Sequence, residues 1–141
     1  MYTRVINYED YDGNQRTLEA HFNLNKAELL ELQVSWDGGL EKVLHKIIEE
    51  KDQKRMIEMF KMIILKSYGK KSLDGNRFEK SEAITEEFTQ TEAYPELFML
   101  LATDDKAAAE FINGIMPKKL IDEAKQQELE EKAKIAQLPQ K

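Results

Sequence analysis

The sequence predicts a mostly helical α+β domain, in which an N-terminal β-hairpin packs on a bundle of about five or six helices. Three observations predict this fold. Apolar residues alternate with polar ones over 15–22, they recur every three or four positions over most of 25–115, and no apolar run is long enough to span a membrane. We place a single globular domain at 1–117, comprising a hairpin (2–22) and a helical body (25–115), followed by a charged helix or tail at 118–141.

The hairpin is predicted from two short strands, at 2–8 and 15–22. The second strand has the period of two that is typical of a strand with one buried face. The Asp-Gly-Asn sequence at 12–14 supplies residues that tolerate the positive φ of a tight turn. Because a lone hairpin is only marginally stable in water, we expect its apolar face to dock on helices.

The helices are predicted from apolar periodicity, from capping residues and from the positions of glycine and proline. The predicted caps are Asn25, which forms a capping box with Glu28, then Asp52, and either Thr103 or Asp104. Pro95 is expected to begin one helix and to exclude Tyr94 from it. The polar, glycine-containing stretch 69–76 is predicted to be a surface loop. The predicted helices cover 25–34, 40–48, 52–68, 81–88, 95–102 and 107–115.

The helix at 52–68 is predicted to be the central and most buried element, since its apolar residues cover more than one face. Phe60 and Ile64 are expected to lie in the core. The same helix carries Met56, Met59 and Met62. These methionines either fill the core, which we favour, or line an adaptable groove for a partner helix.

Composition excludes several classes of function. The chain has 141 residues and no cysteine, which rules out disulfides, thiol nucleophiles and iron–sulfur clusters. A net charge of −6 argues against binding to nucleic acid, which needs a basic surface. The polar N-terminus lacks the apolar stretch of a signal peptide. We therefore expect a soluble protein of the cytoplasmic type that binds neither membrane nor nucleic acid.

One acidic pattern resembles the later half of a calcium-binding loop. Asp10, Asp12 and Gly13 are followed by Glu19 at the spacing of the bidentate ligand, but Tyr8 stands where the first aspartate belongs. The flanks are predicted to be strands and not helices. We interpret the pattern as a hairpin turn and predict no metal site.

No catalytic or cofactor-binding group is assigned. Lys70, Lys71 and Arg77 surround a glycine-containing loop, but the spacing of a phosphate-binding loop is absent. His21 and His45 lie on differently patterned segments, and neighbouring acidic residues on a helix point in different directions. Because no nucleophile, base and orienting group come together by spacing, we predict that the protein is not an enzyme and needs no cofactor.

The candidate partner-binding residues are aromatic and apolar. Tyr94, Phe98 and Leu101 form a ridge beside Pro95 that can anchor a partner helix, and Trp36 lies next to two glycines. The alternative is that the ridge belongs to the core and that Trp36 only packs. The charged segment 118–141 is a second, auxiliary candidate surface.

Several sequence blocks between residues 68 and 114 resemble those of a known family. They are Tyr68-Gly69-Lys70-Lys71-Ser72, Asp74-Gly75, Arg77-Phe78, Phe88-Thr89-Gln90-Thr91-Glu92-Ala93-Tyr94, Leu97-Phe98-Met99, Leu101-Ala102-Thr103-Asp104, Ala107-Ala108-Ala109 and Phe111-Ile112-Asn113-Gly114. Together with the N-terminal hairpin, they are similar to the tail assembly chaperones of phages and prophages of Gram-positive bacteria. The similarity covers about 2–117.

The resemblance implies a non-catalytic chaperone in the host cytoplasm. Such a protein binds the phage tape measure protein, keeps it soluble and assists assembly of the tail tube, with the tail tube protein as a further candidate partner. It is expected to be absent from the mature virion. The resemblance transfers no functional residue, and self-association into a homo-oligomer stays open.

Two other functions stay open. One is a structural virion protein, such as a tail or connector subunit, and the other is a small phage protein that binds a host factor. Mass spectrometry of purified particles separates the first from a chaperone, because a virion subunit is present at stoichiometric copy number.

Overall fold

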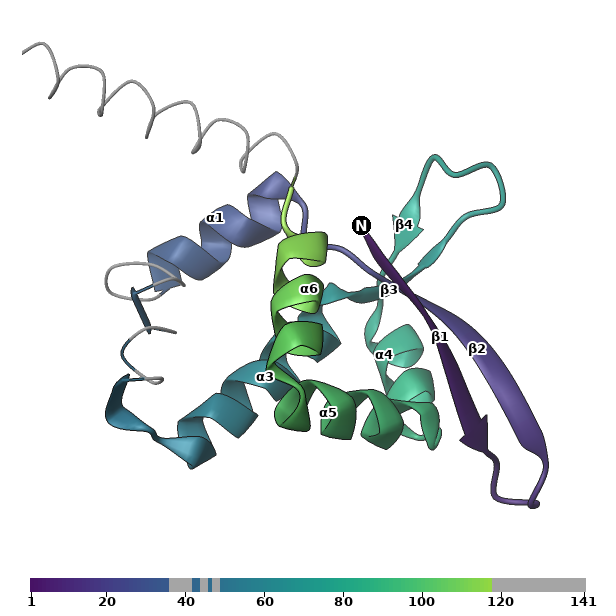
Figure 1. The fold of residues 1–141 in the computed structure, drawn as a ribbon. Coiled ribbons are helices and arrows are strands. Elements are labelled where there is room, and N and C mark those ends of the chain that lie inside the picture. The colour runs from purple at the N-terminus through teal and green to yellow at the C-terminus, as the bar shows by residue number, and fades with distance from the viewer. Residues whose placement is uncertain (36–41, 44–45, 47–48, 118–141) are drawn as a thin grey trace, which may run out of the picture.

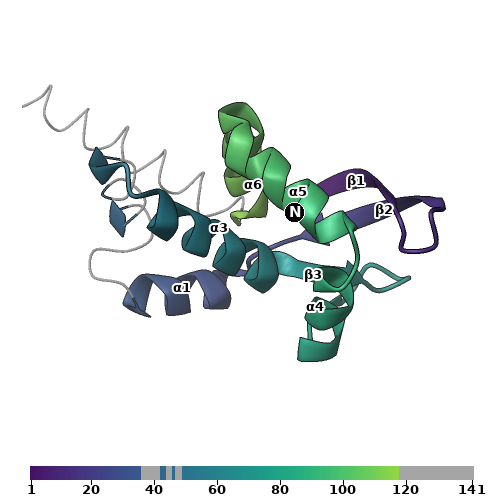
Figure 2. The same cartoon turned by 90° about the horizontal axis from the view of Figure 1, so that it is seen from below.

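The computed structural model describes residues 1–35, 42–43, 46 and 49–117. Within them, an antiparallel four-stranded sheet of order β1-β2-β3-β4 packs against five helices, so the predicted mostly helical α+β fold with an N-terminal hairpin is confirmed. Figures 1 and 2 show the helices gathered to one side, while the tip of the β1–β2 hairpin projects away from them. The elements are β1 (Tyr2–Glu9), β2 (Gln15–Phe22), α1 (Lys26–Ser35), α3 (Gln53–Ser67), β3 (Tyr68–Lys71), β4 (Phe78–Glu79), α4 (Glu82–Thr89), α5 (Ala93–Thr103) and α6 (Asp105–Ile115).

The β1–β2 hairpin confirms the alternation predicted for the N-terminus. The two strands pair antiparallel over their full length. Ile6 in β1 and Ala20 and Phe22 in β2 are buried, while the residues between them are more exposed. One face of the hairpin therefore meets the helices, and the other faces solvent.

Asp10 organises the turn between these strands. Its Oδ1 accepts hydrogen bonds from the backbone N–H groups of Asp12 and Asn14, both at 2.9 Å, and its Oδ2 accepts one from Nε of Arg16 at 2.7 Å. Gly13 takes a φ of +83°, which glycine adopts without steric cost. These acidic and glycine residues thus build the predicted hairpin turn.

A second hairpin, formed by β3 and β4, includes the surface loop predicted at 69–76. Tyr68 and Gly69 in β3 pair with Phe22 and His21 in β2, and β3 also pairs with β4. The prediction of a loop was wrong for 69–71, because β3 is only four residues long and has no apolar alternation, whereas 72–76 form the turn between β3 and β4 and are largely exposed, as predicted. Its pairing partner, β2, lies far away in the sequence.

Position 69 of this hairpin has no room for a side chain larger than that of glycine. A Cβ at this position would lie 2.8 Å from the backbone oxygen of Glu79 and 2.8 Å from the ring of Phe78. Real Cβ atoms do not approach other atoms so closely, so the ring and the strand require glycine here.

The predicted helix starts are confirmed at four capping residues. In each case the side chain of the residue before the helix, or at its entry, accepts a hydrogen bond from a backbone N–H of the first turn. The four residues are Asn25, Asp52, Ser81 and Asp104.

The start of α5 differs from the prediction. The helix begins at Ala93, so Tyr94 is helical and is not excluded by Pro95. N–H groups in the first turn of a helix have no acceptor within the helix, so a proline there sacrifices no hydrogen bond.

Helix α3 is less central than predicted. Its buried side chains are Met59, Ile63, Ile64 and Ser67. Ile64 is in the core as predicted, but Phe60 is only half-buried and is not among the residues packed against the core. A helix that is apolar on several faces does not reveal from its sequence which face meets the sheet. Met56 and Met62 pack against the core, in agreement with the favoured interpretation of the methionines.

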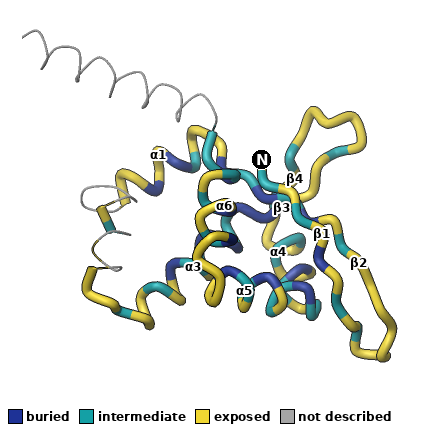
Figure 3. The backbone as a smooth tube through the Cα atoms, viewed as in Figure 1, coloured by how far each residue is buried: buried dark blue, intermediate teal, exposed yellow. Residues whose placement is uncertain are grey.

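Phe22 lies at the centre of the core. Its fully buried ring contacts Tyr2 of β1, Tyr68 of β3, Phe88 of α4 and Phe111 of α6, with centroid distances of 5.4–6.1 Å. Figure 3 shows the buried backbone positions concentrated where these elements meet. Tilted and edge-to-face pairs at such distances add to the stabilisation from burial.

The segment that follows Phe22 ties the ends of two helices together. The backbone N–H of Asn23 donates to the carbonyl of Ser67, the last residue of α3, at 2.8 Å. The N–H of Leu24 donates to the carbonyl of Ile115, the last residue of α6, at 2.9 Å. Carbonyls at helix ends lack partners within the helix, so this segment satisfies both of them.

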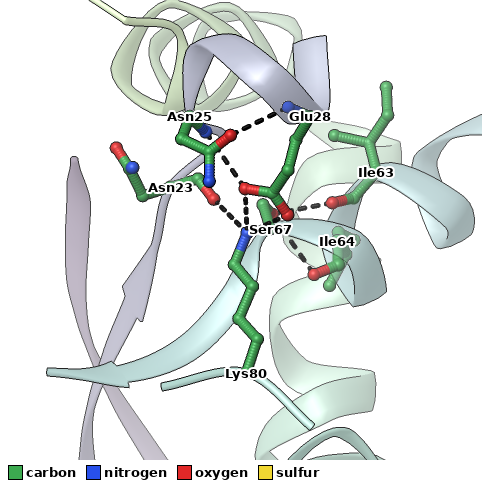
Figure 4. A network of polar contacts seen from close by, with 7 residues as sticks. All are labelled: Asn23, Asn25, Glu28, Ile63, Ile64, Ser67 and Lys80. Atoms are coloured by element: carbon green, nitrogen blue, oxygen red, sulfur yellow. Dashed lines mark hydrogen bonds and ion pairs between the residues drawn. The ribbon is translucent and has the colours of Figure 1, made fainter. Parts of the chain in front are cut away.

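Lys80 fixes the start of α1 (Figure 4). Its Nζ lies 2.7 and 2.8 Å from the two carboxylate oxygens of Glu28 and donates to the carbonyl of Asn23 at 2.7 Å. Glu28 also accepts from the N–H of Asn25, whose side chain caps the helix in return. This capping box, predicted from the sequence, is thereby joined through a partly buried ion pair to Lys80, the residue that follows β4.

Two sequence predictions lie outside the described residues. These are the helix at 40–48, of which the structure describes only isolated positions, and the charged segment 118–141.

Replacing Phe22 by alanine should reduce the free energy of unfolding by about 3–5 kcal/mol, because the change leaves a cavity among four rings. Chemical denaturation of the purified protein measures this loss. The control is Leu73→Ala, at a fully exposed turn position, which should change stability by less than about 0.5 kcal/mol. Similar stabilities for the two variants would contradict the central place of Phe22.

Replacing Asp10 by asparagine should destabilise the protein at neutral pH but not in acid. Hydrogen bonds from Arg16 and from the turn backbone lower the pKa of Asp10 below its ordinary value of 3.8. The carboxylate therefore stabilises the fold above that value, and the contribution disappears as the pH falls through the lowered pKa. Thermal melts of both proteins between neutral pH and about pH 2 measure the difference. Asp12→Asn is the control, and a difference for Asp10 that persists unchanged in acid would refute the role of its charge.

Candidate partner-binding surface

Helix α5 is unusually apolar for an element that reaches the surface. Of its eleven residues, Ala93–Thr103, only Glu96 is charged. A helix that is apolar all round is normally buried all round. The exposed part of α5 is therefore the first place to look for a binding surface.

The inner side of α5 belongs to the core. Ala93, Leu97 and Leu101 are buried at i, i+4 and i+8. Leu101 is only 2% exposed, so the structure places this member of the predicted ridge inside the domain. The core alternative holds for Leu101.

Tyr94 and Phe98 lie at the border between core and surface. Both side chains are half-buried and pack against the core. The Tyr94 ring meets Phe88 edge-on at 5.8 Å and lies 6.0 Å from the Phe98 ring. Burial raises the pKa of the Tyr94 phenol above its ordinary value. The structure thus brings these two predicted residues together at the edge of the aromatic cluster.

A second apolar stripe runs along the outer side of α5. Pro95, Phe98, Met99 and Ala102 occur at i, i+3, i+4 and i+7, which places them on one face of the helix. Met99 is 57% exposed, Ala102 is exposed, and Pro95 and Phe98 are half-buried. We call these four residues the outer stripe.

Met99 is not among the candidate residues singled out from the sequence. The spacing that identifies the outer stripe is present in the sequence, but it overlaps the spacing of the buried stripe on the same helix. Only the burial of Leu97 and Leu101 tells the two stripes apart.

Acidic residues flank the outer stripe. Glu92 precedes α5, Glu96 lies in its first turn, and Asp104 and Asp105 follow its last residue. The charges at both ends of the helix are thus negative, and a partner with basic residues flanking an apolar stretch would match them.

The remaining sequence candidates lie either outside the described residues or in ion pairs of the β3–β4 hairpin. Trp36 and His45 lie outside the described residues. Lys70 forms an ion pair with Glu87 at 3.2 Å, and Arg77 forms one with Glu79 at 3.3 Å. The first pair links the β3–β4 hairpin to α4, the second lies within the hairpin, and both are largely exposed.

The acidic residues of the pattern that resembles a calcium-binding loop lie in different parts of the β1–β2 hairpin. Asp10 and Asp12 lie in the turn, whereas Glu19 lies within β2, opposite Val5. His21 shares a hydrogen bond of 3.0 Å with Thr3 across the two strands. Among the described residues, no group of three or more histidine, aspartate or glutamate side chains is arranged to hold a metal ion.

Exposed apolar side chains also occur on α1. Leu30 is 61% and Val34 is 79% exposed, although Leu29 and Leu32 of the same helix are buried.

No helix in the described part of the chain is both long enough and apolar enough to cross a membrane.

Comparison with known proteins identifies a family. A family model described as phage tail assembly chaperone matches residues 1–141, the whole chain. Neither the curated proteins nor the solved structures give a significant match.

The same substitution should change the stability of the domain differently on the two sides of α5. Leu101→Asp should destabilise or unfold the domain, because it buries a carboxylate without a partner. Met99→Asp should change the free energy of unfolding by no more than about 0.5–1 kcal/mol, since the side chain lies mostly in solvent. Circular dichroism melts compare the variants, and equal losses would show that the outer stripe is packed in solution.

Proposed function

The chain belongs to the phage tail assembly chaperone family, and we propose that it binds the phage tape measure protein, keeps it soluble in the host cytoplasm and assists assembly of the tail tube. It does so without catalysing a reaction and is absent from the finished virion. The observation that carries this proposal is the outer stripe of α5, an apolar helix face left exposed on a folded domain.

The shape of the outer stripe suits a helical client. Pro95 to Ala102 spans about 10 Å along the helix axis, or two turns. A helix of the client that lies along this face would bury Met99 and cover the exposed edge of Phe98. Apolar residues spaced three and four apart on the client would then meet the outer stripe, as in other complexes in which a helix is recognised by its apolar face.

Methionine and aromatic side chains suit this task. The unbranched Met99 side chain adapts to different apolar surfaces, which lets one stripe accept several helical segments of a long client. The Phe98 ring is held in place by packing against the Tyr94 ring, with 6.0 Å between the ring centroids. Little side-chain entropy is therefore lost when a client binds to Phe98.

The charges of the protein support its solubility and that of the complex. The net charge of −6 keeps copies of the protein apart. The acidic residues at the ends of α5 favour clients whose apolar helices are flanked by lysine or arginine and disfavour acidic ones.

Co-expression with the tape measure protein tests the proposal. The wild-type chain should raise the soluble fraction of the client, and Met99→Glu should lower it about tenfold or more, because a charge would be buried in the complex. Phe98→Asp should have a similar effect if the domain stays folded. The soluble client is measured by gel densitometry and by co-purification.

The matched control is Leu73→Glu, which places the same charge on a fully exposed residue of the β3–β4 turn. This variant should solubilise the client as well as the wild type does. If Met99→Glu also leaves solubility intact, the outer stripe is not the binding surface. If the wild type itself gives no soluble client, the tape measure protein is not the client.

A further inference from the structure

The turn of the β3–β4 hairpin holds an apolar side chain in solvent on a well-braced backbone. Leu73 is fully exposed. The backbone N–H of Ser72 donates to the carbonyl of Arg77 at 2.8 Å, which closes the turn. Asp74 accepts hydrogen bonds from the Ser72 hydroxyl at 2.6 Å and from the N–H of Asn76 at 3.0 Å. Because the turn is already ordered, a partner that contacts Leu73 does not have to order it first.

Basic side chains flank Leu73 at the base of the turn. Lys71 ends β3 and Arg77 precedes β4, and both are exposed. Arg77 pairs only with Glu79 of the same hairpin, at 3.3 Å, and an exposed ion pair of this kind costs little to exchange for another. Paired strands lie about 5 Å apart, so the two positive charges lie on either side of the apolar residue. We call Lys71, Leu73 and Arg77 the hairpin tip.

The hairpin tip has the chemistry that the outer stripe of α5 favours in a partner. Met99 is exposed in the outer stripe, and acidic residues lie at both ends of the helix. Glu96 and Asp104 are eight residues apart, or about 12 Å along the helix axis, with Met99 between them. If Leu73 packs on Met99, a basic residue of the tip can face each acidic end, so apolar contact and opposite charges favour the same arrangement.

The hairpin tip meets the outer stripe of a different copy of the chain. Figures 1 and 2 both show the β3–β4 hairpin extending away from α5, so the tip does not lie against the outer stripe of its own copy. The net charge of −6 opposes contact between copies in most orientations. The basic tip and the acidic ends of α5 are an exception, because there the opposite charges face each other.

We propose that the hairpin tip of one copy docks on the outer stripe of a second copy. Without a client the protein then self-associates, and the tip covers the apolar face of α5. A client helix that lies along the whole outer stripe makes more apolar contact than the tip does and displaces it. The inference rests on the outer stripe being the binding surface of the proposed function, but its test needs no client.

Sedimentation velocity of the purified full-length protein, without client, tests the proposal. The wild type should change from monomer to larger species as its concentration rises. Leu73→Glu and Met99→Glu should each weaken the association about tenfold or more, because the contact would bury a charge. The matched control is Leu30→Glu, which places the same charge at a position of α1 that is 61% exposed, close to the 57% of Met99. This control should associate as the wild type does.

Mixing the two defective variants tests whether the tip and the outer stripe contact each other. The contact joins two unlike surfaces. Leu73→Glu keeps an intact outer stripe, and Met99→Glu keeps an intact hairpin tip. An equimolar mixture should therefore form a complex with one copy of each variant, although neither variant associates by itself. A fluorescent label on one variant detects this complex, and circular dichroism verifies that both variants are folded.

Three results would overturn the proposal. They are a wild type that stays monomeric up to about 1 mM, single variants that associate as the wild type does, and a mixture that stays monomeric. Equal loss of association in Leu30→Glu would overturn it too, because the contact would then not be specific. Solubility of the client is measured separately, so a monomeric wild type does not affect the proposed function. Leu73→Glu leaves the outer stripe intact and remains a valid control for client binding.

Discussion

The packing of Phe22 against four other aromatic rings is the interaction on which the other elements depend. These rings come from β1, β3, α4 and α6, which are spread over residues 2 to 111. The sheet and the helices therefore share one apolar centre. The two residues after Phe22 add backbone hydrogen bonds to the last carbonyls of α3 and α6. Side-chain packing and backbone hydrogen bonding thus act at adjacent positions, and the residues after β2 satisfy the last carbonyls of both helices.

This central packing explains how α5 can expose an apolar face without loss of order. Ala93, Leu97 and Leu101 already anchor the helix in the core, and Tyr94 extends the aromatic cluster to its edge. Of the outer stripe, Met99 and Ala102 are exposed and remain available for binding, while Phe98 also packs against the core. A chaperone needs such a division, because it must offer apolar area to a client while its own fold stays intact. Membership of the phage tail assembly chaperone family agrees with a site that consists of a surface and not of catalytic groups.

The candidate site was partly visible in the sequence. Tyr94 and Phe98 were identified from their spacing and aromatic character, and both lie where the core meets solvent. Leu101 and Met99 could not be assigned correctly, because periodicity shows which residues share a face but not which face is covered. On a helix with a single polar face the question does not arise, since the apolar side must be inside. On α5, which has two apolar stripes, the neighbouring elements decide.

Local signals in the sequence determined the N-terminal hairpin, the capping residues Asn25 and Asp52, and the mostly helical class of the fold. Alternation, turn residues and caps act between positions a few residues apart, so they can be recognised without knowing the rest of the structure. The tertiary structure alone decided that β3 and β4 extend the sheet, that Phe60 is half-buried and that Met99 is exposed. The pairing of Tyr68 with Phe22 joins residues 46 positions apart. The physical reason is that burial and strand pairing depend on which distant surfaces meet, and this is settled only when the whole chain packs around Phe22.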